Sequence, residues 1–333
     1  MRKLLLTISA IAAVTAYMPS MAETGNAGYA GDFMRFGLGA RPLGMGGAFA
    51  AIAEGFEACY YNPAGLALYP VRQAGFTYHS LTLDRQLNSA ALISPVRNEA
   101  VMGISWIYGG VGDVQMRDSD RNLAGIFANN SNAVALTFSK MATEYLSLGA
   151  NVRYLQSKLD ELTAYTVGAD FGAIARYKKM ASVGISLQNF GSDLKWDSGK
   201  YWSQGGKSYM DRVPVRIRGG VAALLFDETF IGALDVVKDL NMNIRINLGA
   251  EYWFTTRVKE LVENEEGEGE ALTETMVSER LFGLRTGYND GSFTFGGSLM
   301  YPFGNLNGGF DYAYMTGRRD EGSNHVFTLR VLF

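Results

Sequence analysis

The stretch that decides the fold runs from Tyr145 to Lys158 and has the sequence YLSLGANVRYLQSK. Apolar residues occupy every second position from Leu146 to Tyr154, and small, polar or charged residues fill the positions between them. Because successive side chains of a β-strand point to opposite faces, this period of two predicts a strand with one apolar and one polar face. Its length exceeds the ~5–6 residues of an average globular strand and suits the ~9–11 residues of a membrane-spanning strand.

The same alternation recurs along most of the chain. One such segment would be weak evidence, but about fourteen lie between residue 74 and the end of the sequence. We therefore predict an all-β fold, a transmembrane antiparallel β-barrel of about 14 strands over residues 74–333. An even number of strands puts both ends of the barrel on one side of the membrane. The predicted strands are 74–84, 87–95, 99–109, 132–141, 145–157, 163–177, 180–190, 214–225, 229–239, 243–254, 280–290, 292–302, 307–317 and 323–333.

The two faces of these strands indicate two different surroundings. The apolar face ends in aromatic residues such as Tyr154 and Tyr252, which is typical of the aromatic girdles at bilayer interfaces. The other face carries glycine, hydroxyl, amide and charged residues, which suits a polar lumen. Its charges have two interpretations: a charge-paired network that stiffens the barrel, or a polar conduit that attracts anions. The candidate lumen charges are Arg153, Asp170, Arg216, Arg218, Arg245, Glu251, Arg285 and Asp311.

The beginning of the chain predicts export. Residues 1–22 combine a basic start, a short apolar run and a small-residue cleavage site, which is the signal-peptide pattern. No later segment has ~20 uninterrupted apolar residues, so we expect no membrane-spanning helix. Together with the barrel pattern, this predicts the bacterial outer membrane as the location and outer-membrane lipid as a partner.

Composition excludes several classes of function. A net charge of −3 argues against binding to nucleic acid, and a hydrophobic fraction of 47% argues against disorder. One cysteine and two histidines, His79 and His325, leave no multi-ligand metal site, and we expect no cofactor. GxSxG is absent, and His79 and Ser80 are adjacent on a predicted strand and face opposite ways. We therefore expect no enzyme and no catalytic residues.

Residues 23–73 lack the alternation of the barrel. They contain two small-residue blocks that predict a compact plug inside the barrel, since small residues let backbones approach closely. A nucleotide-binding glycine motif is absent. The lone cysteine, Cys59, is expected to be a small buried residue. The candidate plug residues are Arg41, Gly44, Met45, Gly46 and Gly47 in the first block, and Asn62, Pro63, Ala64 and Gly65 in the second.

These two blocks, within Phe33–Phe49 and Tyr61–Leu66, resemble the N-terminal signature of the PorV/PorQ family, which is related to FadL-type long-chain fatty-acid transporters. The last residues, Phe310–Tyr314 and His325–Phe333, are similar to the last two strands of that family. The resemblance implies a fourteen-stranded outer-membrane barrel with an N-terminal segment in its lumen. It leaves three functions open: transport of a hydrophobic small molecule, docking of secreted proteins in a type IX-like secretion system, or a purely structural barrel.

Three long connections also bear on function. With both barrel ends in the periplasm, the loops 110–131 and 191–213 face outward, and the second has four aromatic residues: Trp196, Tyr201, Trp202 and Tyr209. Aromatic enrichment is typical of binding surfaces, but ordinary interface aromatics explain it as well. The acidic segment 255–279 is expected to be a solvated, mobile loop. It is either an unusual periplasmic excursion or a sign that the strand count is wrong by one.

Overall fold

The computed structural model describes residues 28–333 except 98, 179, 200–204, 264–271, 305 and 318–321. For 257–263 and 272–278 it describes the backbone alone. The signal-peptide prediction for residues 1–22 lies outside the described residues. The described part contains no helix that combines the length and apolarity required to cross a membrane.

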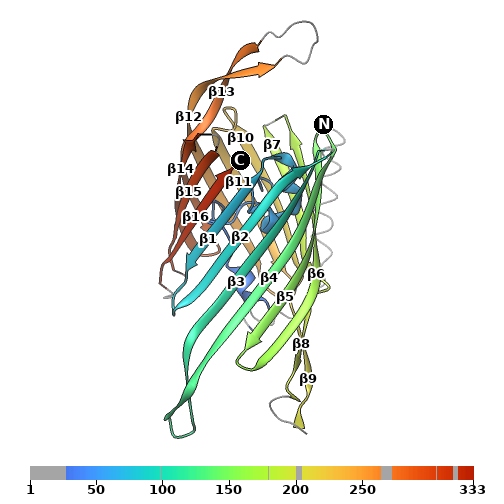
Figure 1. The fold of residues 1–333 in the computed structure, drawn as a ribbon, viewed down its shortest axis with the longest axis vertical. Coiled ribbons are helices and arrows are strands. Elements are labelled where there is room, and N and C mark those ends of the chain that lie inside the picture. The colour runs from blue at the N-terminus through green and yellow to red at the C-terminus, as the bar shows by residue number, and fades with distance from the viewer. Residues whose placement is uncertain are drawn as a thin grey trace.

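Fourteen strands of the described chain close into one antiparallel barrel, which confirms the predicted fold class (Figure 1). Each barrel strand pairs with the next barrel strand along the chain, and β1 closes the barrel on β16 with Gln73 opposite Leu332. The barrel strands are β1 (Gln73–Ser80), β2 (Arg85–Val96), β3 (Ala100–Arg117), β4 (Leu123–Thr143), β5 (Leu146–Leu159), β6 (Leu162–Tyr177), β7 (Ala181–Phe190), β10 (Arg216–Leu225), β11 (Phe230–Asp239), β12 (Ile244–Glu263), β13 (Leu272–Asn289), β14 (Ser292–Phe303), β15 (Leu306–Met315) and β16 (Asn324–Leu332). A separate hairpin, β8 (Asp193–Asp197) with β9 (Ser208–Arg212), is inserted between β7 and β10.

The alternation read from the sequence corresponds to the two faces of the wall. On β5, Leu148 is 47% exposed on the outer surface, whereas Asn151 is 1% exposed inside. On β12, Leu248 is exposed and Asn247 is buried in the same way. Apolar side chains therefore form the outer surface, and the polar face points inward.

The strands run beyond the barrel at both ends, and this corrects two of the expected loops (Figure 1). Much of 110–131 is strand, because β3 continues to Arg117 and β4 begins at Leu123. Likewise β12 and β13 stay paired from Thr255 with Arg280 to Glu263 with Leu272, so 255–279 is not simply a loop. Backbone pairing continues there although the membrane pattern has ended.

The strand count also decides where the acidic segment lies. With fourteen strands, the hairpin of β12 and β13 extends from the end at which β1 begins and β16 finishes. The long β3–β4 hairpin and the β8–β9 hairpin extend from the opposite end (Figure 1). The acidic segment is therefore an excursion at the end of the barrel termini, and the strand count is not in error.

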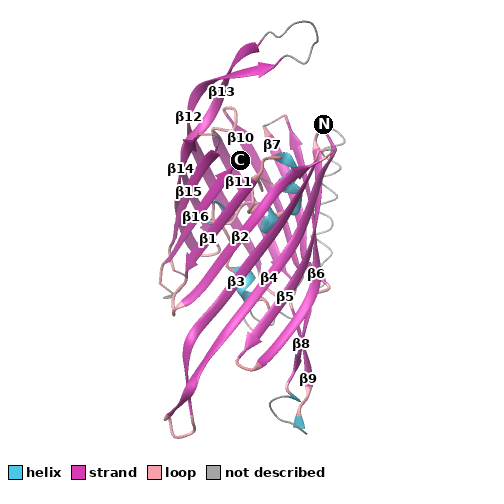
Figure 2. Ribbon diagram, viewed as in Figure 1, coloured by secondary structure: helices cyan, strands magenta, loops and turns pink. Residues whose placement is uncertain are grey.

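The described chain before β1, from residue 28 onward, lies inside the barrel, and its helices are short (Figure 2). These are η1 (Asp32–Arg35), α2 (Ala40–Gly44), α3 (Ala58–Tyr61) and η2 (Pro63–Leu68). Almost every residue from Phe33 to Ala67 is buried or half-buried. We call the described segment from residue 28 to residue 72 the plug.

Candidate functional site

The first contact between plug and wall is a tight elbow, Gly44–Gly47, which follows helix α2. Gly46 and Gly47 have φ of 65° and 79°, a left-handed backbone that glycine adopts without strain. A Cβ on Gly46 would lie 2.4 Å from the Leu248 carbonyl oxygen and 2.5 Å from that of Tyr288. The elbow backbone therefore rests directly on the wall backbone.

The wall is built to receive this elbow, because two of its inward-facing positions are glycines. A Cβ on Gly249 would lie 2.3 Å from the Met45 carbonyl oxygen, and one on Gly287 would lie 2.2 Å from the Gly46 nitrogen. The Thr294 hydroxyl also accepts from the Gly46 N–H at 3.1 Å and donates to the Gly44 carbonyl at 3.0 Å. Backbone and hydroxyl contacts thus replace side-chain packing at this point.

Asn62 organises the second block. Its side-chain amide donates to the Ala50 carbonyl at 2.9 Å, and to the carbonyls of Ala173 on β6 and Ile185 on β7 at 3.2 Å each. Its side-chain oxygen accepts from the Ala64 N–H at 3.2 Å and caps η2, whose first residue is Pro63. One side chain therefore joins two parts of the plug to two strands of the wall.

The rest of the second block is equally close to its surroundings. The Ser139 hydroxyl of β4 donates to the Ala64 carbonyl at 2.9 Å. A Cβ on Gly65 would lie 2.2 Å from the Ala53 carbonyl oxygen, and one on wall residue Gly149 would lie 2.3 Å from the Pro63 carbonyl carbon. Both small-residue blocks therefore mark points where backbones meet.

A buried charge network joins the elbow helix to the wall. Arg41 donates from Nε and Nη2 to the two carboxylate oxygens of Glu251 on β12, at 2.9 and 2.8 Å. Arg285 on β13 donates to the same carboxylate and approaches Asp311 on β15 at 3.4 Å. Glu54 of the plug accepts from Arg41 as well. We call Arg41, Glu54, Glu251 and Arg285 the plug–wall charge network.

A second group of charges holds the chain after the elbow. The Asp235 carboxylate on β11 accepts from the backbone N–H groups of Phe49 and Ala50, both at 2.9 Å. Arg218 on β10 donates to the Gly47 carbonyl at 2.8 Å and pairs with Asp235 at 3.3 Å. These two wall residues therefore fix the plug backbone through its peptide groups.

The remaining predicted charges also lie on the inner face of the barrel wall. Arg216 and Arg245 share the Asp239 carboxylate at 2.6 and 2.7 Å. Arg153 pairs with Asp170, whose other oxygen accepts from the Asn189 N–H at 2.8 Å. All eight candidate lumen charges are buried, and each has an oppositely charged partner. This arrangement favours a charge-paired network over an open polar conduit.

Burial and charge act differently on three titratable groups of the plug. Burial alone would raise the pKa of Glu54, but the charges of Arg41 and Arg280 outweigh it and lower that pKa to about 2. Burial raises the pKa of Glu57 above its ordinary value. Burial also raises the pKa of the Cys59 thiol to about 11, which keeps the thiol protonated and a poor nucleophile.

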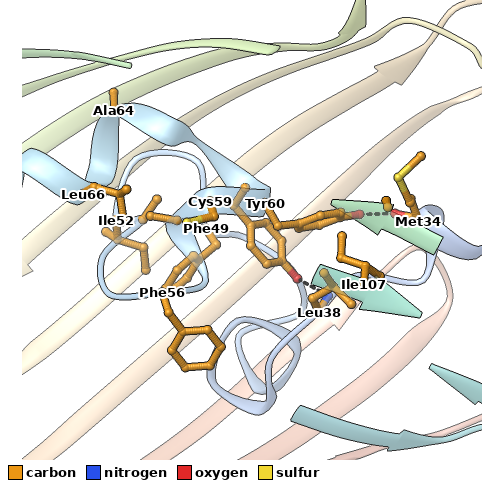
Figure 3. Packing of buried hydrophobic residues seen from close by; sticks show 14 of the residues in the cluster. Met34, Leu38, Phe49, Ile52, Phe56, Cys59, Tyr60, Ala64, Leu66 and Ile107 are labelled. Carbon is orange, nitrogen blue, oxygen red and sulfur yellow. Dashed lines mark hydrogen bonds between the residues drawn. The ribbon is translucent and has the colours of Figure 1, made fainter. Parts of the chain in front are cut away.

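Aromatic and aliphatic side chains of the plug pack together in the apolar cluster (Figure 3). The Tyr61 ring lies edge-on to Phe49 with centroids 5.4 Å apart, and the Tyr61 hydroxyl accepts from the Leu38 N–H at 3.2 Å. A cavity of about 20 Å³ between the plug and strands β2 and β3 is lined in part by Glu57 and Cys59. It has room for about one water molecule.

Several residues of this site were not predicted from the sequence. Glu54 and Asp239 complete charge pairs, but neither has a local pattern that indicates a partner. Trp253 is buried beneath the guanidinium groups of Arg280 and Arg285, at 5.2 and 5.1 Å from its ring. Among the contacts of the wall, only the glycines that receive the elbow, Gly249 and Gly287, could be recognised in the sequence, because they occupy inward-facing positions of the alternation.

The aromatic residues of the 191–213 segment do not form one surface. Trp196 on β8 is half-buried and packs against the apolar core, whereas Tyr209 on β9 is 69% exposed. Tyr201 and Trp202 lie outside the described residues. Within the described part of the chain, no cluster of His, Cys, Asp and Glu has the arrangement of a metal site.

Solved structures with a similar fold are known, although no family model and no curated protein matches the sequence. A deletion mutant of TodX, a monoaromatic hydrocarbon channel, aligns with a TM-score of 0.57 and 13% identity over 89% of this chain and 97% of its own. A Pseudomonas aeruginosa FadL homologue gives 0.56 and 11% over 88% and 97%. The Pseudomonas putida toluene transporter TodX gives 0.56 and 13% over 89% and 96%. The chain therefore shares the fold of FadL-type outer-membrane channels.

Proposed function

We propose that this protein is an outer-membrane channel through which a hydrophobic small molecule passes under the control of the plug. The observation that carries the proposal is the apolar cluster inside the barrel, which reaches the end opposite the barrel termini. There Phe33, Met34 and Leu38 of the plug are buried in one cluster with Leu194 on β8 and Val213, which follows β9. A hydrophobic molecule can take the place of these side chains when the plug segment moves.

Two further features support passage of an apolar rather than a polar molecule. The eight lumen charges are paired, and the cavity beside Glu57 and Cys59 measures only about 20 Å³, so the described interior is packed with side chains rather than open as a polar lumen. The proteins with the same fold include channels named for monoaromatic hydrocarbons and toluene. A porin for sugars or ions would require the opposite arrangement, an open polar lumen.

The wall also has a seam that suits a sideways exit into the membrane. The ladder between β6 and β7 is irregular between Ala169 and Phe171, and the part of β6 before Ala169 pairs with β5 alone among the described strands. Beside it, among the described residues, no backbone ladder joins β8 to β6, and the Asp193 N–H of β8 donates to the Thr166 hydroxyl of β6 at 3.1 Å. An apolar molecule can leave here without breaking a continuous ladder.

The test is uptake of a hydrophobic probe with the seam open and closed. In a Cys59→Ser background, Thr166→Cys and Asp193→Cys together place a disulfide across the seam. We expect oxidation to reduce uptake of radiolabelled toluene or hexadecanoic acid into proteoliposomes, and reduction to restore it. The control pair is Ser131→Cys with Ser157→Cys, since these residues face each other across the intact β4–β5 ladder with hydroxyls 3.0 Å apart. Equal uptake with both disulfides formed, or uptake of glucose in place of the hydrophobic probes, would contradict the proposal.

A second function, docking of secreted proteins as the PorV/PorQ resemblance implies, is favoured by the outward hairpins. Leu123 and Ile126 near the tip of the β3–β4 hairpin and Tyr209 on β9 are large apolar side chains exposed beyond the barrel. Truncating the β3–β4 hairpin between 112 and 128 separates the two functions. If the protein docks secreted proteins, the truncated variant should lose its bound partner and keep its uptake of the hydrophobic probe. If the protein only transports, neither the full-length protein nor the variant should retain a partner.

A further inference from the structure

The outer wall has an apolar groove of about 730 Å³ that crosses four neighbouring strands, β10 to β13. Its bottom is a row of small residues that face each other in register: Ala223 opposite Gly232, Gly232 opposite Ala250, and Ala250 opposite Thr286. One side of the groove is a parallel row of large side chains. Each lies two residues from the small residue of its own strand, toward the end opposite the barrel termini: Val221, Leu234, Leu248 and Tyr288. The groove exists because small side chains in register leave a channel between larger ones.

The groove runs obliquely across the apolar band of the barrel. It begins at Ala223, close to the β10–β11 turn on the side of the barrel termini, and finishes at Thr286, close to the β13–β14 turn on the opposite side. Four strands at a spacing of ~4.8 Å give it a length of about 14 Å. Because the groove runs obliquely, its depth along the membrane normal is less than this length, and it fits wholly within the ~30 Å hydrocarbon core of a bilayer.

The chemistry of the residues that line the groove indicates which kind of apolar molecule fits. It contains no charged residue, and its only side-chain polar atoms are the hydroxyls of Thr286 and Tyr288, which both lie toward one end. A free fatty acid would have no cation here for its carboxylate, whereas a lipid keeps its headgroup at the interface.

We propose that this groove binds one acyl chain of a membrane lipid against the outside of the wall. The site differs from the interior path of the proposed function and does not depend on it. Behind the groove, Gly249 and Gly287 receive the plug elbow, so the wall there is a single backbone layer without side chains toward the plug. The bound chain therefore packs on the same strands that hold the elbow.

The experiment uses the whole protein in nanodiscs of phosphatidylglycerol that carries a diazirine at the end of one acyl chain. After irradiation, peptide mass spectrometry maps the labelled positions. We expect labels to concentrate on the segments 221–234, 248–250 and 286–293. Ala250→Phe fills the middle of the groove, and Ala223→Leu narrows its end, so that either variant serves if the other does not fold. Each should lower this labelling about tenfold, equivalent to ~1.4 kcal/mol of binding.

The matched control is Ala150→Phe, an alanine on β5 between the outward-facing and exposed Leu148 and Val152, three strands away from β10 in the barrel order. It adds the same side chain to the same kind of surface and should leave the labelling unchanged. Labels spread evenly around the barrel, or equal labelling of the groove in Ala250→Phe and the control, would overturn the proposal. So would crosslinks between two copies of the chain through 221–250 in place of lipid labels, because they would identify a second barrel as the occupant.

Discussion

Replacing Glu251 with glutamine tests whether the plug–wall charge network fastens the plug. The Glu251 carboxylate is 1% exposed and takes two hydrogen bonds from Arg41 and one from Arg285. The amide keeps the shape but removes the charge, and one of its ends donates where an oxygen accepted. Each charge-assisted bond contributes ~1.5–3 kcal/mol, and breaking a buried ion pair costs ~3–5 kcal/mol. We therefore expect Glu251→Gln to weaken plug docking by about 3 kcal/mol or more.

Amide hydrogen exchange measures this loss directly. A change of about 3 kcal/mol is an increase of roughly 100-fold in the exchange rates of the plug amides at 40–53, since ~1.4 kcal/mol is a factor of ten. Amides of β12 should change little, because the ladder does not depend on the carboxylate. The control is Asp311→Asn, which removes a buried carboxylate bonded to the wall residues Arg285, Ser298 and Arg330. Its main effect should fall on the wall. Unchanged plug exchange in Glu251→Gln, or equal plug release in the two variants, would refute the reasoning.

Three further predictions follow from the same contacts. Leu148→Arg puts a charge on the outer surface of β5 and should cost ~2–4 kcal/mol of folding free energy in vesicles, measured by urea titration; a cost near zero would mean that this face does not meet lipid. Gly46→Val combines an unfavourable φ with a Cβ 2.4 Å from a wall carbonyl, so we expect a barrel that still shifts on a heat-modifiability gel but conducts small solutes, whereas loss of the barrel would make the plug part of the folding nucleus. Because the pKa of Glu54 is lowered from 4.5 to about 2, its stabilising effect is complete above pH 4.5 and declines as the pH falls toward 2, so plug exchange should rise over that range in the wild type and much less in Glu54→Gln.

The strands could be predicted from the sequence because their two faces meet different surroundings. Alternation at Leu146–Tyr154 and at Ile244–Phe254 reflects an apolar exterior and a packed polar interior, and a period of two needs no knowledge of distant residues. The extensions of β3, β4, β12 and β13 were missed for the same reason. Beyond the apolar band the regular alternation of apolar and polar residues stops, so pairing continues without a pattern that reveals it.

The site was predictable only in part. The small-residue blocks indicated close backbone approach, and the structure places Gly46 and Asn62 against the wall. Their partners are set by closure of the barrel. Arg41 meets Glu251 across 210 residues of sequence, and no local pattern specifies such a pair. Glu54 is one acidic residue among many until the fold places it beside Arg41 and Arg280.

The distance in sequence between plug and wall has a consequence for the order of assembly. The plug is synthesised before the strands, yet Ala40 bonds to Thr328 across 288 residues and Gly46 bonds to Thr294 across 248. Its receiving surface is complete only when β16 has joined β1. Contacts this distant in sequence form late and slowly. Refolding should accordingly show closure of the sheet first and docking of the N-terminal segment as a separate, slower phase, during which buried residues such as Phe49 and Ile52 stay exposed to any chaperone that holds the chain.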